Sequence, residues 1–88
     1  MKNNQLGRFN IDVKLIRNNP NLIAKVFALL GIVPVRAECL YAEGVIEYVA
    51  ICNSFLEIEE DPGQIPPEYK LIIRNNGNLT ADFILVSK

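Results

Sequence analysis

The sequence predicts an α+β domain in which one helix packs on a mostly antiparallel sheet, in the order β-α-β-β-β-β. An alternating first segment, one apolar helical stripe and two later pairs of strand-like segments around turn signals support this class. The chain has 88 residues, half of them hydrophobic, which is enough for one domain over 1–88. We expect residues 1–6 to be flexible.

The first strand is predicted over GRFNIDVKLI, residues 7–16. Its apolar and polar residues alternate with the period of a half-buried strand: Phe9, Ile11, Val13 and Leu15 against Arg8, Asn10, Asp12 and Lys14. A helix is predicted next, over Pro20–Leu30. Asn19 is a favourable N-cap, proline suits the first helical turn, and Gly31 is a good stop signal.

This helix has apolar residues on more than one side. Its main stripe consists of Leu22, Ile23, Val26, Phe27 and Leu30. The remaining positions include Ala24, Ala28 and Leu29, and only Lys25 is charged between Leu22 and Leu30. A surface helix normally has a polar back, so we expect a second subunit or a partner to cover this one. An alanine-rich exposed side is the alternative.

The segment from Val35 to Cys52 predicts a hairpin around a two-residue Glu43-Gly44 turn. One face then holds Val35, Ala37, Cys39, Tyr41, Ile46, Tyr48, Ala50 and Cys52, and we expect it to pack under the helix. Both cysteines are expected to be buried, reduced thiols, since they do not face each other and lack metal-site spacing. The other face holds Arg36, Glu38, Leu40, Glu47, Val49 and Ile51.

The second face mixes charges with large aliphatic residues. Such a surface suits a subunit interface or a pocket with a charged rim. In the predicted register Glu38 and Glu47 are diagonal neighbours, which leaves a carboxylate pair conceivable. The alternative is a structural network in which Arg36 and Arg74 neutralise the two acids.

The connector after this hairpin contains a cluster of acids: Glu57, Glu59, Glu60 and Asp61. We expect a solvated loop, although the cluster could instead mimic phosphates for a basic partner. A turn that buries Phe55 and a second turn at Asp61-Pro62-Gly63 are predicted here. Asn76-Gly77 predicts a closing hairpin between strands over Tyr69–Arg74 and Leu79–Val86.

Composition excludes several kinds of chemistry. The chain has no histidine, which removes His-based nucleophilic systems and His-ligated metals, and no phosphate-binding glycine motif. We expect no cofactor, no enzymatic activity and no metal. The pI of about 5.3 argues against direct nucleic-acid binding. The start MKNNQLGR lacks the apolar core of a secretory signal, and no stretch is long enough to span a bilayer, so a cytoplasmic protein is expected.

The stretch from Val35 to Ile73 resembles small uncharacterised proteins of tailed bacteriophages. Those proteins pair an R-x-E-x-x-Y strand with an E-Y-x-A strand, followed by a Ser-Phe turn and a P-x-Y strand start. The matching positions are Arg36, Glu38, Tyr41, Glu47, Tyr48, Ala50, Ser54, Phe55, Pro67 and Tyr69. Cys39 and Cys52 depart from the pattern. The resemblance implies a counter-defence factor in the cytoplasm of a host cell.

Three hypotheses follow. The first is a homo-oligomeric sponge that sequesters a nucleotide-type immune signal. Arg36 and Arg74 would bind phosphate, Glu38 and Glu47 would accept hydrogen bonds from base or ribose, and Ser54 would add a hydroxyl. The subunit interface would comprise Ala24, Ala28, Leu29, Leu40, Val49 and Ile51. The second is an inhibitor of a CRISPR effector or nuclease, acting through the acidic surface. The third is a structural or regulatory phage subunit without a pocket.

Overall fold

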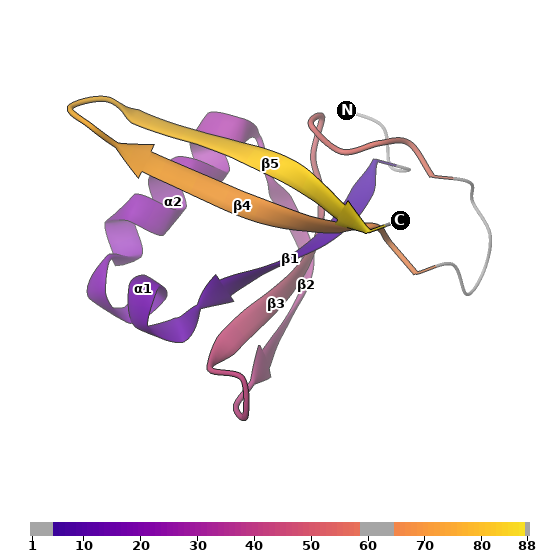
Figure 1. Ribbon diagram of the computed structural model, residues 1–88, viewed down its shortest axis with the longest axis horizontal. Coiled ribbons are helices and arrows are strands. Elements are labelled where there is room, and N and C mark those ends of the chain that lie inside the picture. Colours follow the sequence, from indigo (N-terminus) through magenta and orange to yellow (C-terminus); the bar gives the residue numbers. More distant parts are fainter. Residues whose placement is uncertain (1–4, 59–64, 88) are drawn as a thin grey trace.

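The computed structural model describes residues 5–58 and 65–87, and these form an α+β fold with a five-stranded sheet and two short helices (Figure 1). The elements follow in the order β1 (Leu6–Asp12), α1 (Val13–Asn18), α2 (Pro20–Leu30), β2 (Val33–Leu40), β3 (Val45–Ile51), β4 (Glu68–Asn75) and β5 (Leu79–Ser87). The predicted class is confirmed, while the predicted order lacked α1. No helix of the described ranges is both long and apolar enough to cross a membrane.

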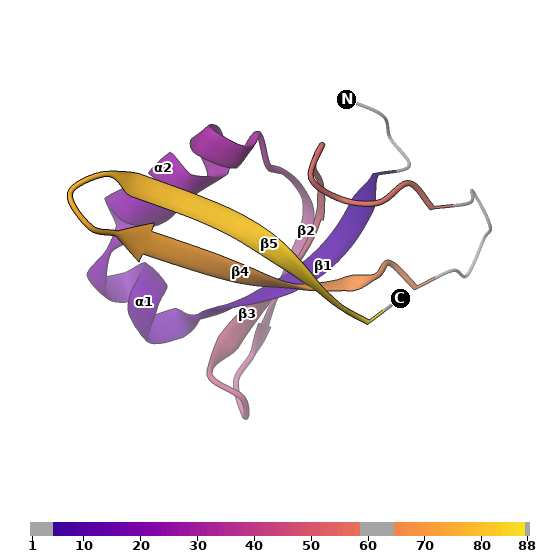
Figure 2. The same ribbon diagram turned by 45° about the horizontal axis from the view of Figure 1, so that its top comes forward.

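The strands lie in the order β2-β3-β1-β4-β5, which makes β1 the centre and leaves β2 and β5 at the edges. β1 is antiparallel to β3 over seven paired positions but parallel to β4, with which it shares only the Arg8–Glu68 position in the described chain. Beyond that position the two strands diverge. The β4–β5 hairpin then extends past the helices, while the β2–β3 hairpin projects away from them (Figures 1 and 2).

The first strand is shorter than predicted. The alternation suggested a strand to Ile16, but the chain turns into α1 at Val13. Asp12 causes the change, because it keeps an extended backbone while its carboxylate accepts a hydrogen bond from the Lys14 N–H at 2.8 Å. Leu15 and Ile16 then pack against the core from a helix instead of a strand.

The prediction for α2 is confirmed from Pro20 to Leu30. Gly31 ends the helix in the left-handed conformation, at φ 66°, which favours glycine. Asn19 occupies the N-cap position, but its side chain makes no capping bond there; its amide donates to the Leu15 carbonyl of α1 at 3.4 Å instead. Asn19 thus connects the two helices.

The core lies between the helices and the sheet face that carries Phe9 and Ile11. Its buried members are Phe9, Ile11, Ile23, Val26, Ile32, Ala50, Cys52, Phe55 and Tyr69. Phe9 lies at its centre: its ring stacks on Tyr48 with centroids 5.4 Å apart and meets Phe83 at 5.1 Å. The aromatic rings thus join β1, β3 and β5 into one packed unit.

The segment after β3 is anchored by Phe55, as predicted. The Phe55 N–H donates to the Cys52 carbonyl at 3.0 Å, and the buried ring stacks on Tyr69 with centroids 4.4 Å apart. Gly7 allows this packing, because a Cβ there would lie 2.8 Å from ring carbons of both Phe55 and Tyr69. The Tyr69 hydroxyl also accepts a hydrogen bond from the Leu56 N–H at 2.8 Å.

The β2–β3 hairpin differs from the prediction in its register and its coverage. A four-residue loop over 41–44 replaces the two-residue turn, so Glu38 faces Glu47 and Arg36 faces Val49. The shift is two residues, which preserves the two faces from Arg36 to Leu40; before that, an irregularity leaves Val35 without a paired position. The helices do not cover β2, however. Val35, Ala37 and Cys39 are exposed and Tyr41 is 89% exposed, so the prediction that they pack under the helix was wrong; only Cys52 is a buried thiol.

The closing hairpin is confirmed. β4 and β5 pair from Glu68 to Asn75, and Gly77 sits in the turn with φ 89°. The predicted Asp61-Pro62-Gly63 turn lies outside the described residues, as do residues 1–4. β1 begins at Leu6, and the Gln5 amide donates to the Phe55 carbonyl at 3.2 Å.

Candidate functional site

The sheet surface opposite the helices carries a group of polar side chains that we name the polar face. It comprises Arg8, Asn10, Arg36, Glu38, Glu47, Glu68 and Lys70. Strand periodicity produces it, because Phe9, Ile11 and Tyr48 point to the core and their chain neighbours point the other way. The polar face crosses four strands, from β2 to β4.

The structure brings together three of the predicted ligand residues on β2 and β3. Arg36 Nη2 lies 4.0 Å from Glu47 Oε1, with 65% of the arginine side chain and 25% of the glutamate side chain exposed. Glu38 lies directly opposite Glu47, not diagonal to it. Like charges in opposed positions repel. Among the described residues no ion pair offsets this repulsion at Glu38.

Arg8 on β1 holds the centre of the polar face, a role that sequence reasoning missed. Its Nη1 lies 3.0 Å from Glu68 Oε1, its Nε donates to the Pro66 carbonyl at 2.9 Å, and its backbone N–H donates to the Pro67 carbonyl at 2.9 Å. These contacts fasten the start of β4 to β1, where the two strands share their paired position. The alternation of β1 put Arg8 on the correct side, but nothing in the sequence named its partners.

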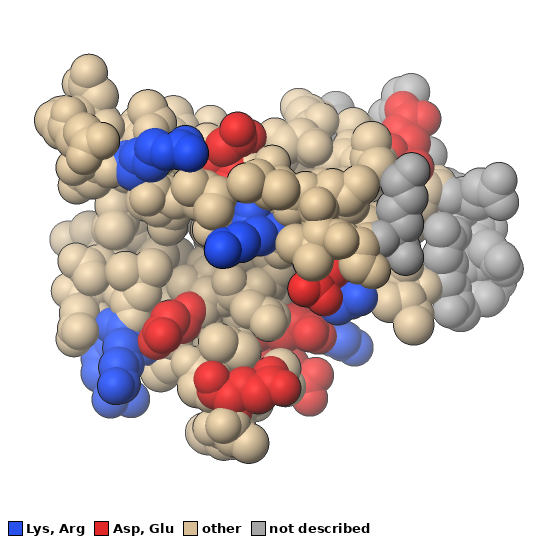
Figure 3. Space-filling model, viewed as in Figure 1, with Lys and Arg blue, Asp and Glu red and all other residues tan. Residues whose placement is uncertain are grey.

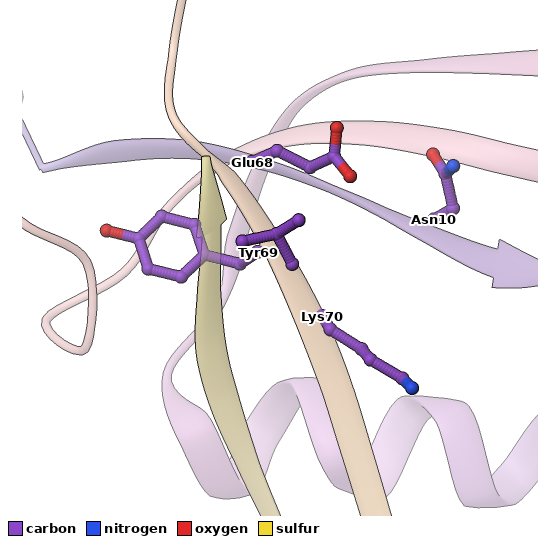
Figure 4. A pocket seen from close by; sticks show the side chains of 5 residues that line it. Asn10, Glu68, Tyr69 and Lys70 are labelled. Atoms are coloured by element: carbon purple, nitrogen blue, oxygen red, sulfur yellow. The ribbon is translucent and has the colours of Figure 1, made fainter. Parts of the chain in front are cut away.

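A pocket opens where β1 and β4 separate, next to Arg8. It has a volume of about 290 Å³ and is lined by Asn10, Glu68, Tyr69, Lys70 and Val86. Figure 4 shows Glu68 and Asn10 extending to the same side from two different strands, while the ring of Tyr69 points away. The volume is near the lower end for small-molecule sites. An amide, a carboxylate and an ammonium thus border one hollow with an apolar wall from Val86.

Arg74 and Ser54 do not join this group. Arg74 lies six residues beyond Glu68 on β4, which is about 20 Å along a strand. Ser54 is exposed in the turn after β3. The Arg36 and Arg74 guanidinium groups therefore lie in separate regions, and a single small anion cannot bridge them.

The predicted interface residues occupy two separate surfaces. Ala24, Ala28 and Leu29 are exposed on α2. Leu40, Val49 and Ile51 are half-buried on β2 and β3, on the same side of the sheet as the polar face. One contact with a partner would cover one of these surfaces, not both.

The predicted acidic surface falls mostly outside the described residues, which include only Glu57 of its four members. Glu57 is exposed, whereas Glu59, Glu60 and Asp61 are not described. Acidic and basic side chains are interspersed over the face in Figure 3, with no broad area of one sign. On the face drawn in Figure 3, the charged side chains form neither a basic groove nor an acidic one.

The side chains of the polar face suit the binding of a ligand through hydrogen bonds and charge. Over the described ranges, no three His, Cys, Asp or Glu residues come together to hold a metal ion. Burial raises the pKa of the Tyr48 phenol, but this half-buried side chain packs against the core, away from the polar face. Of the titratable groups in residues 5–58 and 65–87, only this phenol has a clearly shifted pKa, and it has no part in the site.

Searches against protein families, curated protein sequences and solved structures each found no match. The inference of function therefore depends on the residues and geometry of this chain.

Proposed function

We propose that the chain is a non-enzymatic binding protein that holds a small, nucleotide-type ligand on the polar face. The observation that carries the proposal is the pocket between β1 and β4, where Lys70, Asn10 and Glu68 border about 290 Å³. Lys70 is the phosphate-binding group, because its ammonium makes no ion pair or hydrogen bond in the described chain. Asn10 and Glu68 accept hydrogen bonds from the base or the ribose.

Arg36 is the second cation of the proposed site. It is largely exposed and only loosely paired with Glu47, so its guanidinium is available to a phosphate. Arg36 shares a row across the sheet with Arg8 and Glu68, about 14 Å or three strand spacings wide, and Lys70 lies two residues, about 7 Å, further along β4. A ligand that engages both cations is therefore extended, with more than one phosphate or more than one nucleotide.

The resemblance to small phage proteins supplies the biological role in this proposal. A homo-oligomer that holds a nucleotide immune signal would keep it from its host receptor without chemical change. The role needs affinity and abundance, not turnover. It is consistent with a site of hydrogen-bonding groups that has no nucleophile activated by histidine.

Isothermal titration with ADP, a cyclic dinucleotide and inorganic phosphate tests the proposal. We expect one of the two nucleotides to bind and phosphate alone to bind far more weakly. Lys70→Gln should raise the dissociation constant about 10- to 100-fold, the cost of one charge-assisted hydrogen bond. Lys25→Gln removes the same charge from α2 and is the matched control.

Arg74→Gln tests whether the ligand reaches the far end of the β4–β5 hairpin, where Arg74 lies. An effect there as large as that of Lys70→Gln would move the phosphate site to that end of the hairpin and contradict the pocket. Absence of binding by all three probes would also contradict it. Salt-sensitive inhibition of a nuclease, lost when Glu57, Glu59, Glu60 and Asp61 are neutralised, would favour the inhibitor hypothesis instead. If both assays fail, the structural-subunit hypothesis becomes the leading one.

A further inference from the structure

The free edge of β2 is the most exposed regular element of the described chain. Seven of its eight residues are exposed, and within residues 5–58 and 65–87 it pairs with β3 alone. Exposed apolar residues accompany this edge: Val33 is 48%, Val35 59% and Tyr41 89% exposed. An edge strand presents unpaired backbone groups to any strand that can align with it.

The order of residues on β2 is complementary to itself. When two antiparallel copies of VPVRAECL are aligned on Ala37, Arg36 of each copy lies opposite Glu38 of the other. Such opposed residues have Cβ atoms about 4.5–5.5 Å apart, within reach of an ion pair. We propose that β2 pairs with β2 of a second copy about a two-fold axis at Ala37, which joins the two sheets into one.

The electrostatics of the polar face favour this partner. Within one copy Glu38 faces Glu47, and no described cation pairs with Glu38. The second copy would place its Arg36 on the other side of Glu38, next to that carboxylate and two strand spacings from Glu47. Two-fold symmetry creates this arrangement twice, so the repulsion at Glu38 is relieved in both subunits.

The charges also select one register. A shift by two residues in either direction would place Arg36 opposite Arg36 or Glu38 opposite Glu38. Like charges in opposed positions destabilise a strand pair. Pro34 and the irregularity between Pro34 and Arg36 are features that normally block an edge. Because the pairing is antiparallel, they would lie at both ends of the shared ladder, with Pro34 of each copy opposite Leu40 of the other, and would leave Arg36, Ala37 and Glu38 free to pair at its centre.

The opposite side of the new ladder would be apolar. Val35 of one copy would lie opposite Cys39 of the other, next to the irregularity between Pro34 and Arg36. A pair of single strands belongs to the smaller class of interfaces, below about 1,200 Å². We therefore expect a weak dimer with a dissociation constant in the high micromolar range. Arg36 takes part in both the proposed ligand site and this contact, whereas Lys70 belongs only to the pocket and Glu38 only to the contact, so Lys70→Gln and Glu38→Arg test the two separately.

Sedimentation velocity over a range of concentrations, combined with charge reversal, tests the pairing. The unaltered protein should dimerise as its concentration rises, whereas Arg36→Glu and Glu38→Arg should each remain monomeric. Mixing the two variants should restore a dimer, because one has two acids on the strand and the other has two bases. The double variant should dimerise by itself. Lys25→Glu, a reversal on α2, should behave like the unaltered protein.

Circular dichroism verifies that each variant is folded. If a reversal disturbs the fold, Arg36→Gln and Glu38→Gln replace it, and a several-fold higher dissociation constant is expected for each. A protein that stays monomeric at every concentration would overturn the proposal. Self-association unchanged in both single variants would also overturn it and would assign the contact to another surface, such as the exposed side of α2.

Discussion

The two edge strands of the sheet are held in different ways. On β5, Leu79, Ala81 and Phe83 are half-buried and alternate with exposed residues. β5 also contacts α2, and the Phe83 ring meets Phe9, Phe55 and Tyr69. β2 is exposed along nearly its whole length. β5 is thus held by packing against the core, whereas β2 is held by its hydrogen-bonded pairing with β3.

This difference is the basis for the proposal that β2, and not β5, pairs with a second copy. β5 has exposed apolar residues in its C-terminal half, but Val86 there forms a wall of the pocket. β2 instead has charges in an order that matches a second copy of itself. An edge without packing whose charges are self-complementary is better explained by a partner strand than by solvent. The predictions below compare these regions, from the largest expected effect to the smallest.

Replacing an aromatic ring separates the two edges most strongly. Phe83→Ala should lower the free energy of unfolding by about 2–3 kcal/mol, somewhat less than for a fully buried phenylalanine. Tyr41→Ala, at the end of β2, should change it by less than about 0.5 kcal/mol because that ring is exposed. Urea denaturation at low protein concentration measures both. Equal losses in the free energy of unfolding for the two variants would show that the Tyr41 ring is packed against the protein in solution.

Two arginines of the polar face provide the next comparison. Arg8→Met removes hydrogen bonds to Pro66 and Glu68 and should cost about 1–2 kcal/mol. Arg36→Met removes one loose, exposed ion pair and should cost less than about 0.5 kcal/mol in the monomer. Thermal unfolding of dilute protein measures the difference. A larger loss of stability for Arg36→Met than for Arg8→Met would show that the arginine that stabilises the sheet lies on β2 and not on β1.

The smallest effect concerns Tyr48 at alkaline pH. Burial raises the pKa of its phenol in the folded protein, so the unfolded chain loses this proton first. The contribution to stability is full below the ordinary tyrosine pKa of about 10 and is lost as pH rises through the folded value. Tyr48→Phe should therefore lose less stability than the unaltered protein between about pH 9 and pH 11. Parallel curves for the two proteins would show that Tyr48 is solvated in solution.

The sequence was a good guide to elements defined by local signals. Asn19-Pro20 and Gly31 bounded α2, and Asn76-Gly77 located the closing turn. From Arg36 to Leu40 the two faces of β2 were also predicted correctly, because a register error of two residues leaves side chains on the same face; the irregularity at Val35 was not predicted. Local signals failed at Asp12, where Val13 and Leu15 fit either a strand or a helix.

The site was harder to predict than the fold. Arg36, Glu38 and Glu47 were placed together correctly because they belong to one hairpin. The pocket needs β1 beside β4, and Asn10 and Lys70 are far apart in the sequence. No local pattern encodes that pairing. The exposure of Cys39 and Tyr41 was missed for a similar reason: the reach of the helical layer over the sheet is a tertiary property.

Hydrogen exchange at low and high protein concentration, followed by mass spectrometry, tests the difference between the two edges most directly. Peptides that cover β2 should exchange more slowly at high concentration, because a second strand would protect their outward N–H groups. Peptides that cover β5 should exchange at the same rate in both samples. Two results would contradict the account of β2 as the edge completed by a second copy. One is exchange that slows with concentration in β5 but not in β2, and the other is an exchange rate that concentration changes in neither strand.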